Sequence, residues 1–276
     1  MFLIELLKSV LFGIVEGITE WLPISSTGHM ILLNEFLSLN VSEEFWEMFE
    51  VVIQLGAILA VIVLFFGKLN PFSPAKSTGE KKGTWRLWGL VILAVLPSAV
   101  IGLLLDDWLD AHFYNYGTVA VALIVYGVAF ILIERLGKSK RPRVERVEDL
   151  SVRDALTVGA FQVLAVIPGT SRSGSTILGG MLFGLSRTAA AEFSFYLAIP
   201  TMAGASLLKA VKYFLDGNAP SAQEWSLLAV GCAVAFLVSL LVIRCLMDYV
   251  RRHSFSAFGI YRILLGLLVL GYFWLR

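Results

Sequence analysis

The sequence predicts an all-α integral membrane protein with an inverted-topology repeat, in which each half is a re-entrant helical hairpin plus three transmembrane helices. Three observations lead to this fold class. Hydrophobic residues make up 58% of the 276 residues and charged residues only 16%, whereas about 25% of the residues in a typical soluble domain are charged. Long apolar segments alternate along the chain with clusters of charge. Two of the apolar segments are interrupted by short stretches of Pro, Gly and Ser.

The overall composition excludes two classes of protein. The 22 Lys+Arg and 21 Asp+Glu nearly cancel, to a net charge of +1, and nucleic-acid binders normally carry a clear basic excess, so we expect no nucleic-acid partner. A mean hydropathy of +0.80 excludes a disordered chain, which would combine low hydrophobicity with high net charge. Two cysteines, Cys232 and Cys245, are too few for a disulfide framework.

Six apolar windows are predicted to span the lipid bilayer, because a spanning helix needs about 20 mostly apolar residues. In chain order they cover residues 49–66, 87–105, 117–133, 193–208, 225–243 and 255–275. Some of these windows are short, and we expect their helices to extend into the flanking residues.

Two further apolar segments, residues 1–33 and 155–185, are expected to form helical hairpins. The first is broken by Pro23-Ile-Ser-Ser-Thr-Gly28 and the second by Pro168-Gly-Thr-Ser-Arg-Ser-Gly174. Proline removes a backbone donor and glycine weakens a helix, so each segment should be two helical pieces around a polar loop.

The distribution of Lys and Arg predicts the topology. Sixteen of the 22 lie in residues 68–86, 135–153 and 244–262, whereas residues 34–50 and 106–116 contain acids but no Lys or Arg. The positive-inside rule places the three basic regions in the cytoplasm. All three can lie there if the second broken segment enters and leaves the membrane on the same side. The alternative is an exception to the charge rule.

By the same count, residues 1–33 form a re-entrant hairpin that enters from the outside, and the chain is a single polytopic membrane domain. Repeat one covers about residues 1–134 and repeat two about residues 152–276, joined by a basic cytoplasmic linker at 135–151. We therefore expect a multi-pass membrane protein with the acidic segment 34–50 on the side opposite the basic regions.

Weak internal similarity supports the repeat. Residues 23–27 resemble residues 168–172, and Glu50 corresponds to Glu192. Inverted repeats with broken helices typically hold a site near the membrane midplane, where helix N-termini and irregular backbone line a wet cavity.

Close to its break, the first broken segment carries Glu16 and Glu20, whose spacing puts them on one helix face. Two like charges at membrane depth need a cation, a proton or water, which makes them candidates for catalysis and for metal binding. The next polar side chains across the break are Ser25, Ser26, Thr27 and His29. Helix capping is the alternative role for the hydroxyls, and a structural role is the alternative for the histidine.

The second broken segment supplies the opposite charge. Arg172 can grip two phosphate oxygens, and a helix restarting after it would aim free N–H groups at an anion. The other candidate phosphate-binding positions are Gly169, Ser171, Ser173, Gly174, Ser175 and Thr176. Structural pairing of Arg172 with Glu16 or Glu20 is the alternative, and the two roles can coexist.

Acids, a histidine, a serine and an arginine-bearing phosphate cradle together predict phosphoryl transfer. Carboxylates can hold a divalent metal that also binds phosphate oxygens. A positioned hydroxyl or water then attacks phosphorus, while the arginine and the metal stabilise the charge of the transition state.

The two motifs, Glu16-Gly-Ile-Thr-Glu-Trp-Leu-Pro-Ile-Ser-Ser-Thr-Gly-His29 and Pro168-Gly-Thr-Ser-Arg-Ser-Gly-Ser-Thr176, resemble the signatures of bacterial undecaprenyl-diphosphate phosphatases, the bacitracin-resistance family. Residues 49–56 and 192–195 match as well, and the similarity runs over essentially the whole chain. The resemblance implies a membrane hydrolase that removes the terminal phosphate from undecaprenyl diphosphate. It also implies a divalent cation (Mg²⁺ or Ca²⁺), a homodimer, a location in the bacterial cytoplasmic (inner) membrane and an active site open to the outer face. That sidedness agrees with the topology predicted from charge.

The resemblance further implies the roles of individual residues. Glu16 and Glu20 match the metal-associated acids, and Ser26 matches the proposed nucleophile. His29 matches the histidine that assists proton transfer, and Arg172 the arginine that binds the diphosphate. The remaining polar positions of the phosphate loop match Ser171, Ser173 and Thr176. Direct attack by water, with Ser26 only orienting the phosphate, stays open.

The main alternative to a hydrolase is a transporter that flips polyprenyl phosphate across the bilayer, because inverted repeats and charges at the midplane are also typical of carriers. A phosphate-release assay separates the two, since a pure carrier liberates no phosphate.

Overall fold

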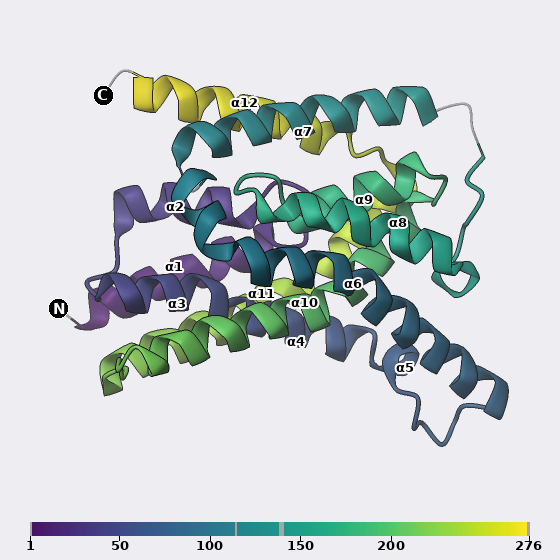
Figure 1. Cartoon of the computed structure of the whole chain (residues 1–276), viewed down its shortest axis with the longest axis horizontal. Coiled ribbons are helices and arrows are strands. Elements are labelled where there is room, and N and C mark those ends of the chain that lie inside the picture. The colour runs from purple at the N-terminus through teal and green to yellow at the C-terminus, as the bar shows by residue number, and fades with distance from the viewer. Residues whose placement is uncertain (1, 114, 138–140, 275–276) are drawn as a thin grey trace.

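The computed structural model describes residues 2–113, 115–137 and 141–274, and within these ranges the chain is helical. The helices, coloured by position in Figure 1, are α1 (Phe2–Thr19), α2 (Ser26–Leu37), α3 (Glu43–Val52), α4 (Gln54–Leu64), α5 (Phe66–Leu69), α6 (Thr78–Phe113), α7 (Tyr116–Gly137), α8 (Val152–Val163), α9 (Arg172–Leu182), α10 (Arg187–Leu215), α11 (Ala222–Arg252) and α12 (Ser256–Trp274), with short 3-10 turns η1 (Val147–Asp149) and η2 (Leu164–Val166).

Six segments of the described chain are long and apolar enough to cross a membrane, and each coincides with one predicted window. They are Glu43–Leu64 (α3 with α4), Thr78–Leu105 (part of α6), and the whole of α7, α10, α11 and α12. As expected, most of the helices extend beyond the apolar windows. The all-α, multi-pass membrane architecture predicted from the sequence is therefore confirmed.

The two broken segments form helix pairs. Residues 2–33 form α1, a short loop and most of α2, and residues 155–185 form most of α8, then η2, a short loop and α9. In Figure 1, α1 and α2 lie toward the left end of the molecule and α8 and α9 toward the right end. Helices α2, α8 and α9 have 12, 12 and 11 residues. Since a helix rises 1.5 Å per residue, each is only about 17–18 Å long, too short to cross a hydrocarbon core of ~30 Å alone.

The hairpins pack against spans that are distant in sequence. Helix α1 lies along α11, and α8 lies along α6. A Cβ on Gly13 of α1 would come within 2.7 Å of the Gly231 carbonyl oxygen, and one on Gly159 of α8 within 2.3 Å of the Ala94 carbonyl oxygen. Glycine thus allows both helix pairs to approach closely, the means by which helices associate inside lipid.

The described chain has close contacts both between spanning helices and around the linker that joins the two predicted repeats. Helices α7 and α12 lie against each other along one edge of the molecule. In the predicted cytoplasmic linker, Arg143 pairs with Asp154 at the start of α8, and Val144 bridges to Leu185. Residues 138–140 of that linker lie outside the described residues.

One part of the charge prediction was wrong. Arg262 belongs to the basic region 244–262 assigned to the cytoplasm, but it lies in α12 and is fully buried. The other arginines of that region, Arg244, Arg251 and Arg252, are exposed on α11. The charge rule counts basic residues near helix ends. It does not distinguish an exposed arginine from one, such as Arg262, whose side chain is buried in the second turn of the next helix.

Candidate active site

The two hairpin breaks begin their second helices in the same way. Ser25 and Ser171 are the described non-glycine residues with positive φ, at 75° and 72°. Each one N-caps the helix that follows: the Ser25 hydroxyl accepts from the Gly28 N–H, and the Ser171 hydroxyl accepts from the Gly174 N–H. Helix α2 therefore starts with Ser26 and α9 starts with Arg172, immediately after a sharply turned backbone.

A carboxylate from the first hairpin joins these two helix starts. Glu20 Oε1 accepts from Arg172 Nη2 at 2.7 Å, and Glu20 Oε2 accepts from the Ser26 hydroxyl at 2.5 Å. The three side chains are buried or nearly so, with Arg172 11% exposed and Glu20 6% exposed in their ion pair. The predicted opposition of acids in one hairpin to a guanidinium in the other is confirmed.

Helix α10 and the first hairpin fix the Arg172 guanidinium from the other side. Its Nη1 donates to the Ser194 carbonyl at 2.7 Å, and its charge lies over the Trp21 ring at 5.9 Å from the ring centroid. The guanidinium is therefore held in place, while its buried Nε–H is left without a hydrogen-bond partner.

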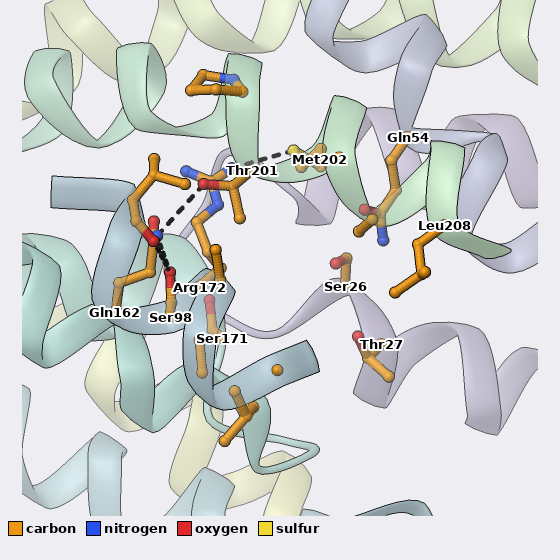
Figure 2. A pocket seen from close by; sticks show the side chains of 18 of the residues that line it. Ser26, Thr27, Gln54, Ser98, Gln162, Ser171, Arg172, Thr201, Met202 and Leu208 are labelled. Carbon is orange, nitrogen blue, oxygen red and sulfur yellow. Dashed lines mark hydrogen bonds between the residues drawn. The ribbon is translucent and has the colours of Figure 1, made fainter. Parts of the chain in front are cut away.

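Arg172 and Ser26 line a cavity of about 410 Å³ between the hairpin breaks and helices α6 and α10. Figure 2 shows this cavity, with Ser171 and Arg172 on one side and Ser26 and Thr27 on another. Its other lining residues are mainly apolar or small and come from α6, η2 and α10; they include Val95, Ala99, Gly102, Leu103, Ala165, Pro200, Gly204, Ala205 and Leu208. The chamber has a polar end at Ser26 and Arg172, some further polar side chains on its walls and an otherwise apolar or small lining, which suits an amphipathic ligand.

A second cavity, of about 580 Å³, adjoins the first, since Thr27, Gln54 and Pro168 line both. It is acidic, because Glu16, Glu43, Glu47 and Glu50 also line it, with Lys209 as its basic residue. Glu43 and Glu47 belong to the acidic segment 34–50 that the charge pattern places outside the cell. The cavity that holds Ser26 and Arg172 therefore adjoins a cavity lined by the acidic segment 34–50.

Glu16 is fully buried, and neither of its carboxylate oxygens has a hydrogen-bond partner. An unpaired carboxylate at this depth is costly unless a cation compensates it. No cluster of three or more His, Cys, Asp or Glu side chains within the described ranges could hold a metal by itself. Glu16 and the neighbouring Glu20 thus fit a divalent cation whose remaining ligands are waters and phosphate oxygens, as magnesium prefers.

Several predicted site residues point elsewhere. His29 lies one turn into α2, where Nδ1 contacts the Ser25 carbonyl and Nε2 contacts the Tyr261 hydroxyl, both at 2.7 Å. No hydrogen bond between His29 and Ser26 occurs in the described structure, so its part in proton transfer stays a prediction. Ser173 donates to the Glu20 carbonyl at 3.0 Å, and Thr176 pairs with the Ser194 hydroxyl at 2.7 Å.

The outcome for the predicted phosphate loop is therefore divided. Gly169, Ser171, Arg172 and Thr27 line the first cavity. Ser25 acts as a helix cap, while Ser173 and Thr176 fasten the hairpins to each other and to α10. The phosphate-binding role of these last three residues stays a prediction.

Sequence reasoning missed four polar residues that line the first cavity, labelled in Figure 2 as Gln54, Ser98, Gln162 and Thr201. Gln162 Nε2 donates to the Ser98 hydroxyl at 2.6 Å and to the Thr201 hydroxyl at 3.3 Å. The signal that could have found them is polarity inside an apolar run, because a lone Gln in a membrane segment needs a partner.

Comparison with known proteins adds independent information. A family model described as "Bacitracin resistance protein BacA" matches residues 9–268. A protein named undecaprenyl-diphosphatase from Enterococcus faecalis is 56% identical over 275 residues, covering 100% of this chain and 99% of the relative. Proteins of the same name from Streptococcus thermophilus and Lactiplantibacillus plantarum are 57% and 55% identical over 271 residues; each match covers 98% of this chain, and 94% and 98% of the respective relatives.

Proposed function

The chain belongs to the BacA family of bacitracin resistance proteins, and from this premise we propose that it hydrolyses undecaprenyl diphosphate to undecaprenyl phosphate and inorganic phosphate. It is a membrane-embedded phosphatase. Its product is the lipid carrier of cell-wall synthesis, so the enzyme recycles that carrier and confers resistance to bacitracin.

The observation that carries the assignment of the site is the contact of Glu20 with both Ser26 and Arg172 across the two hairpin breaks. It joins a hydroxyl, a base and an anion-binding group in one cavity. Phosphoryl transfer needs these three functions, since positioning and charge stabilisation supply most of its catalysis.

Glu20 is the group placed to activate Ser26. As the Ser26 hydroxyl oxygen bonds to the terminal phosphorus, its proton passes to Glu20 Oε2, to which it is already hydrogen-bonded at 2.5 Å. The bond from phosphorus to the bridging oxygen breaks, and undecaprenyl phosphate leaves with the electron pair. Water then cleaves the phosphoserine and releases phosphate. The alternative is direct attack by water, with Ser26 orienting the phosphate.

Arg172 and the start of α9 receive the terminal phosphoryl group. Arg172 lines the first cavity, where its guanidinium can donate to a phosphate oxygen and its fixed charge lowers the energy of the transition state. The N-terminus of an eleven-residue helix adds unpaired N–H groups at the same place. Ser194 and Trp21 keep the guanidinium from turning away before substrate arrives.

Glu16 and Glu20 would hold the divalent cation that the family resemblance implies. The orphaned oxygens of Glu16 support this assignment. When bound, Mg²⁺ or Ca²⁺ would neutralise phosphate charge and polarise the phosphorus–oxygen bonds. Glu20 serves the metal as well as Ser26 and Arg172 in this proposal, because each carboxylate oxygen keeps a second lone pair beside the hydrogen bond that it accepts.

The polyprenyl tail would leave the site between α6 and α10. On this side the first cavity is lined by Leu103 and Leu208, and by glycines at 102 and 204 where an added Cβ would meet open space. Apolar walls let the tail reach lipid without exposing it to water, while the diphosphate stays at the polar end.

We further propose the inverted-topology repeat, with both hairpins re-entrant. Support comes from three pairs of positions that are each 146 residues apart. These are the helix caps Ser25 and Ser171, their glycine donors Gly28 and Gly174, and the contact glycines Gly13 and Gly159 of α1–α11 and α8–α6. This register differs by one residue from the sequence alignment of 23–27 with 168–172 and by four residues from the pairing of Glu50 with Glu192.

The sidedness and the oligomer are also proposals. The acidic cavity supports opening of the site to the outer face of the cytoplasmic membrane, because residues 34–50 lack Lys and Arg. A homodimer is carried over from the family resemblance alone, and light scattering of the detergent-solubilised protein tests it.

The test of the proposed function is phosphate release from undecaprenyl diphosphate by the purified protein in detergent. We expect multiple turnovers that EDTA stops, and phosphorylated Ser26 in a quenched reaction. A protein that binds the lipid but releases no phosphate would instead be the transporter. Substantial turnover in Ser26→Ala would assign the attack to water.

A further inference from the structure

Arg262 is a fully buried arginine to which the proposed mechanism gives no role. It lies in α12 and does not line either cavity of the site. Its guanidinium donates to backbone carbonyls only: Pro23 at 3.1 Å, Gly169 at 2.8 Å, Thr170 at 3.0 Å, Leu123 at 3.4 Å and Ala122 at 3.5 Å.

This arginine makes no ion pair with any carboxylate in the described chain. Burying a guanidinium is unfavourable, and the cost is offset only when its N–H groups meet well-placed acceptors. Here the acceptors are carbonyl dipoles from two loops and α7. If Arg262 only occupied space beside α7, an apolar side chain would do so without the unfavourable burial of a charge. A buried arginine at this position therefore indicates a specific role.

Three of the five carbonyls that Arg262 binds, those of Pro23, Gly169 and Thr170, lie one or two residues before the two helix caps. Pro23 lies two residues before Ser25, and Thr170 lies directly before Ser171. One guanidinium therefore holds both hairpin loops at the point where the backbone turns into α2 and α9. Its Nη1 also lies 3.1 Å from the position a Cβ on Gly174 would take, so α9 starts directly against it.

We propose that Arg262 is a positioning residue that locks the two hairpin loops together, so that Ser26 and Arg172 keep the separation that phosphoryl transfer requires. The inference rests on the proposed function. Arg262 does not touch substrate; it acts by holding the carbonyls behind the site, which leaves the first residues of α2 and α9 directed into the cavity. Lysine cannot replace it, because an ammonium is a point charge, whereas the planar fork reaches two loops at once.

The test is the kinetics of Arg262→Lys in the full-length protein, with undecaprenyl diphosphate as substrate. We expect kcat to fall about 100-fold, the loss that a misplacement of about 1 Å causes, with KM nearly unchanged. In an Arg172→Lys background, the same substitution should change the rate little, because both residues then act on one alignment. Arg244→Lys, an exposed arginine on α11, is the matched control and should keep the wild-type rate.

A second measurement reports the loops without relying on activity. Spin labels at positions 37 and 182, at the ends of α2 and α9, are placed in a Cys232→Ser, Cys245→Ser background. We expect a narrow distance distribution with Arg262 and a broad one in Arg262→Lys. Wild-type kcat in Arg262→Lys, or an unchanged distance distribution, overturns the inference. Absence of phosphate release from the wild-type protein would instead refute the proposed function, and the spin-label result would still decide the role of Arg262.

Discussion

Ser25 and Ser171 have nearly the same backbone conformation, with φ of 75° and 72°, although they lie in different halves of the chain. Each serine accepts a hydrogen bond from a glycine N–H three residues later and immediately precedes a cavity residue, Ser26 or Arg172. Positive φ is unfavourable for residues other than glycine. Strain of this kind persists where surrounding contacts fix it and clusters at functional sites.

Replacing Ser25 or Ser171 should destabilise the protein more with alanine than with glycine. Alanine loses the cap and keeps the strain, whereas glycine loses the cap but adopts positive φ freely. We expect the glycine variants to be more stable by about 1 kcal/mol, measured by thermal unfolding in detergent. Ser42 caps α3 at a φ of −67°, so the gap between glycine and alanine should be smaller there. If the glycine and alanine variants differed in stability by the same amount at all three positions, positive φ at Ser25 and Ser171 would not be a source of strain.

Glu16→Gln should weaken cation binding. Removing one of two carboxylates should lower Mn²⁺ affinity at least about 10- to 100-fold, since losing a residue that only hydrogen-bonds to a metal ligand already has an effect of that size. Electron paramagnetic resonance of Mn²⁺ with the purified protein measures this affinity. In EDTA the same variant should melt at a higher temperature than wild type, because it removes an unpaired buried charge. Glu44→Gln, which is exposed and lines neither cavity of the site, is the control. Unchanged Mn²⁺ binding would exclude Glu16 as a ligand.

Gly204→Trp should discriminate between long and short substrates. The indole would fill the space between α6 and α10 that we assign to the tail. We expect KM for undecaprenyl diphosphate to rise about tenfold, or 1.4 kcal/mol, with little change for a short prenyl diphosphate. Gly89→Trp, an exposed and equally open glycine on α6, is the control. If KM rises equally for both substrates, the tail takes another route.

The contact between Asp154 and Arg143 predicts a dependence of stability on pH. Burial alone would raise the pKa of Asp154, but hydrogen bonds from Arg143 and Ser151 outweigh it and hold the pKa below its usual value. The stability that this carboxylate contributes is therefore complete above about pH 4, the unfolded value, and lost as pH falls through the lowered folded pKa. Wild type should unfold at a higher temperature than Asp154→Asn at pH 7, and the two unfolding temperatures should converge at acid pH. If the difference in unfolding temperature stayed constant with pH, ionisation of Asp154 would not be the cause of the difference.

The parts of the fold that depend on local composition could be predicted from the sequence. Apolar length identified the six spans, and Pro and Gly located both hairpin breaks. The pairing of Glu20 with Arg172 could also be predicted, because two opposite charges at membrane depth in a largely apolar chain have few other partners.

The parts that depend on distant neighbours could not. His29 meets Tyr261, and Arg262 meets Pro23, across more than 230 residues of sequence, and periodicity gives no information on such partners. Nor does it show which hydroxyls of a serine-rich loop face the cavity. Ser171 lines it, while Ser173, two residues later, turns toward the first hairpin.

The central claim is that Glu20 and Arg172 act as one catalytic unit assembled from both halves of the chain. Its most direct test is phosphate release from undecaprenyl diphosphate by Glu20→Gln, Arg172→Lys and the double variant, with exposed Glu145→Gln as control. We predict that each single variant loses about 10³-fold in kcat and that the double variant is hardly slower, since groups acting as a unit are not additive. Wild-type turnover in either single variant, or losses that multiply in the double variant, would contradict the claim.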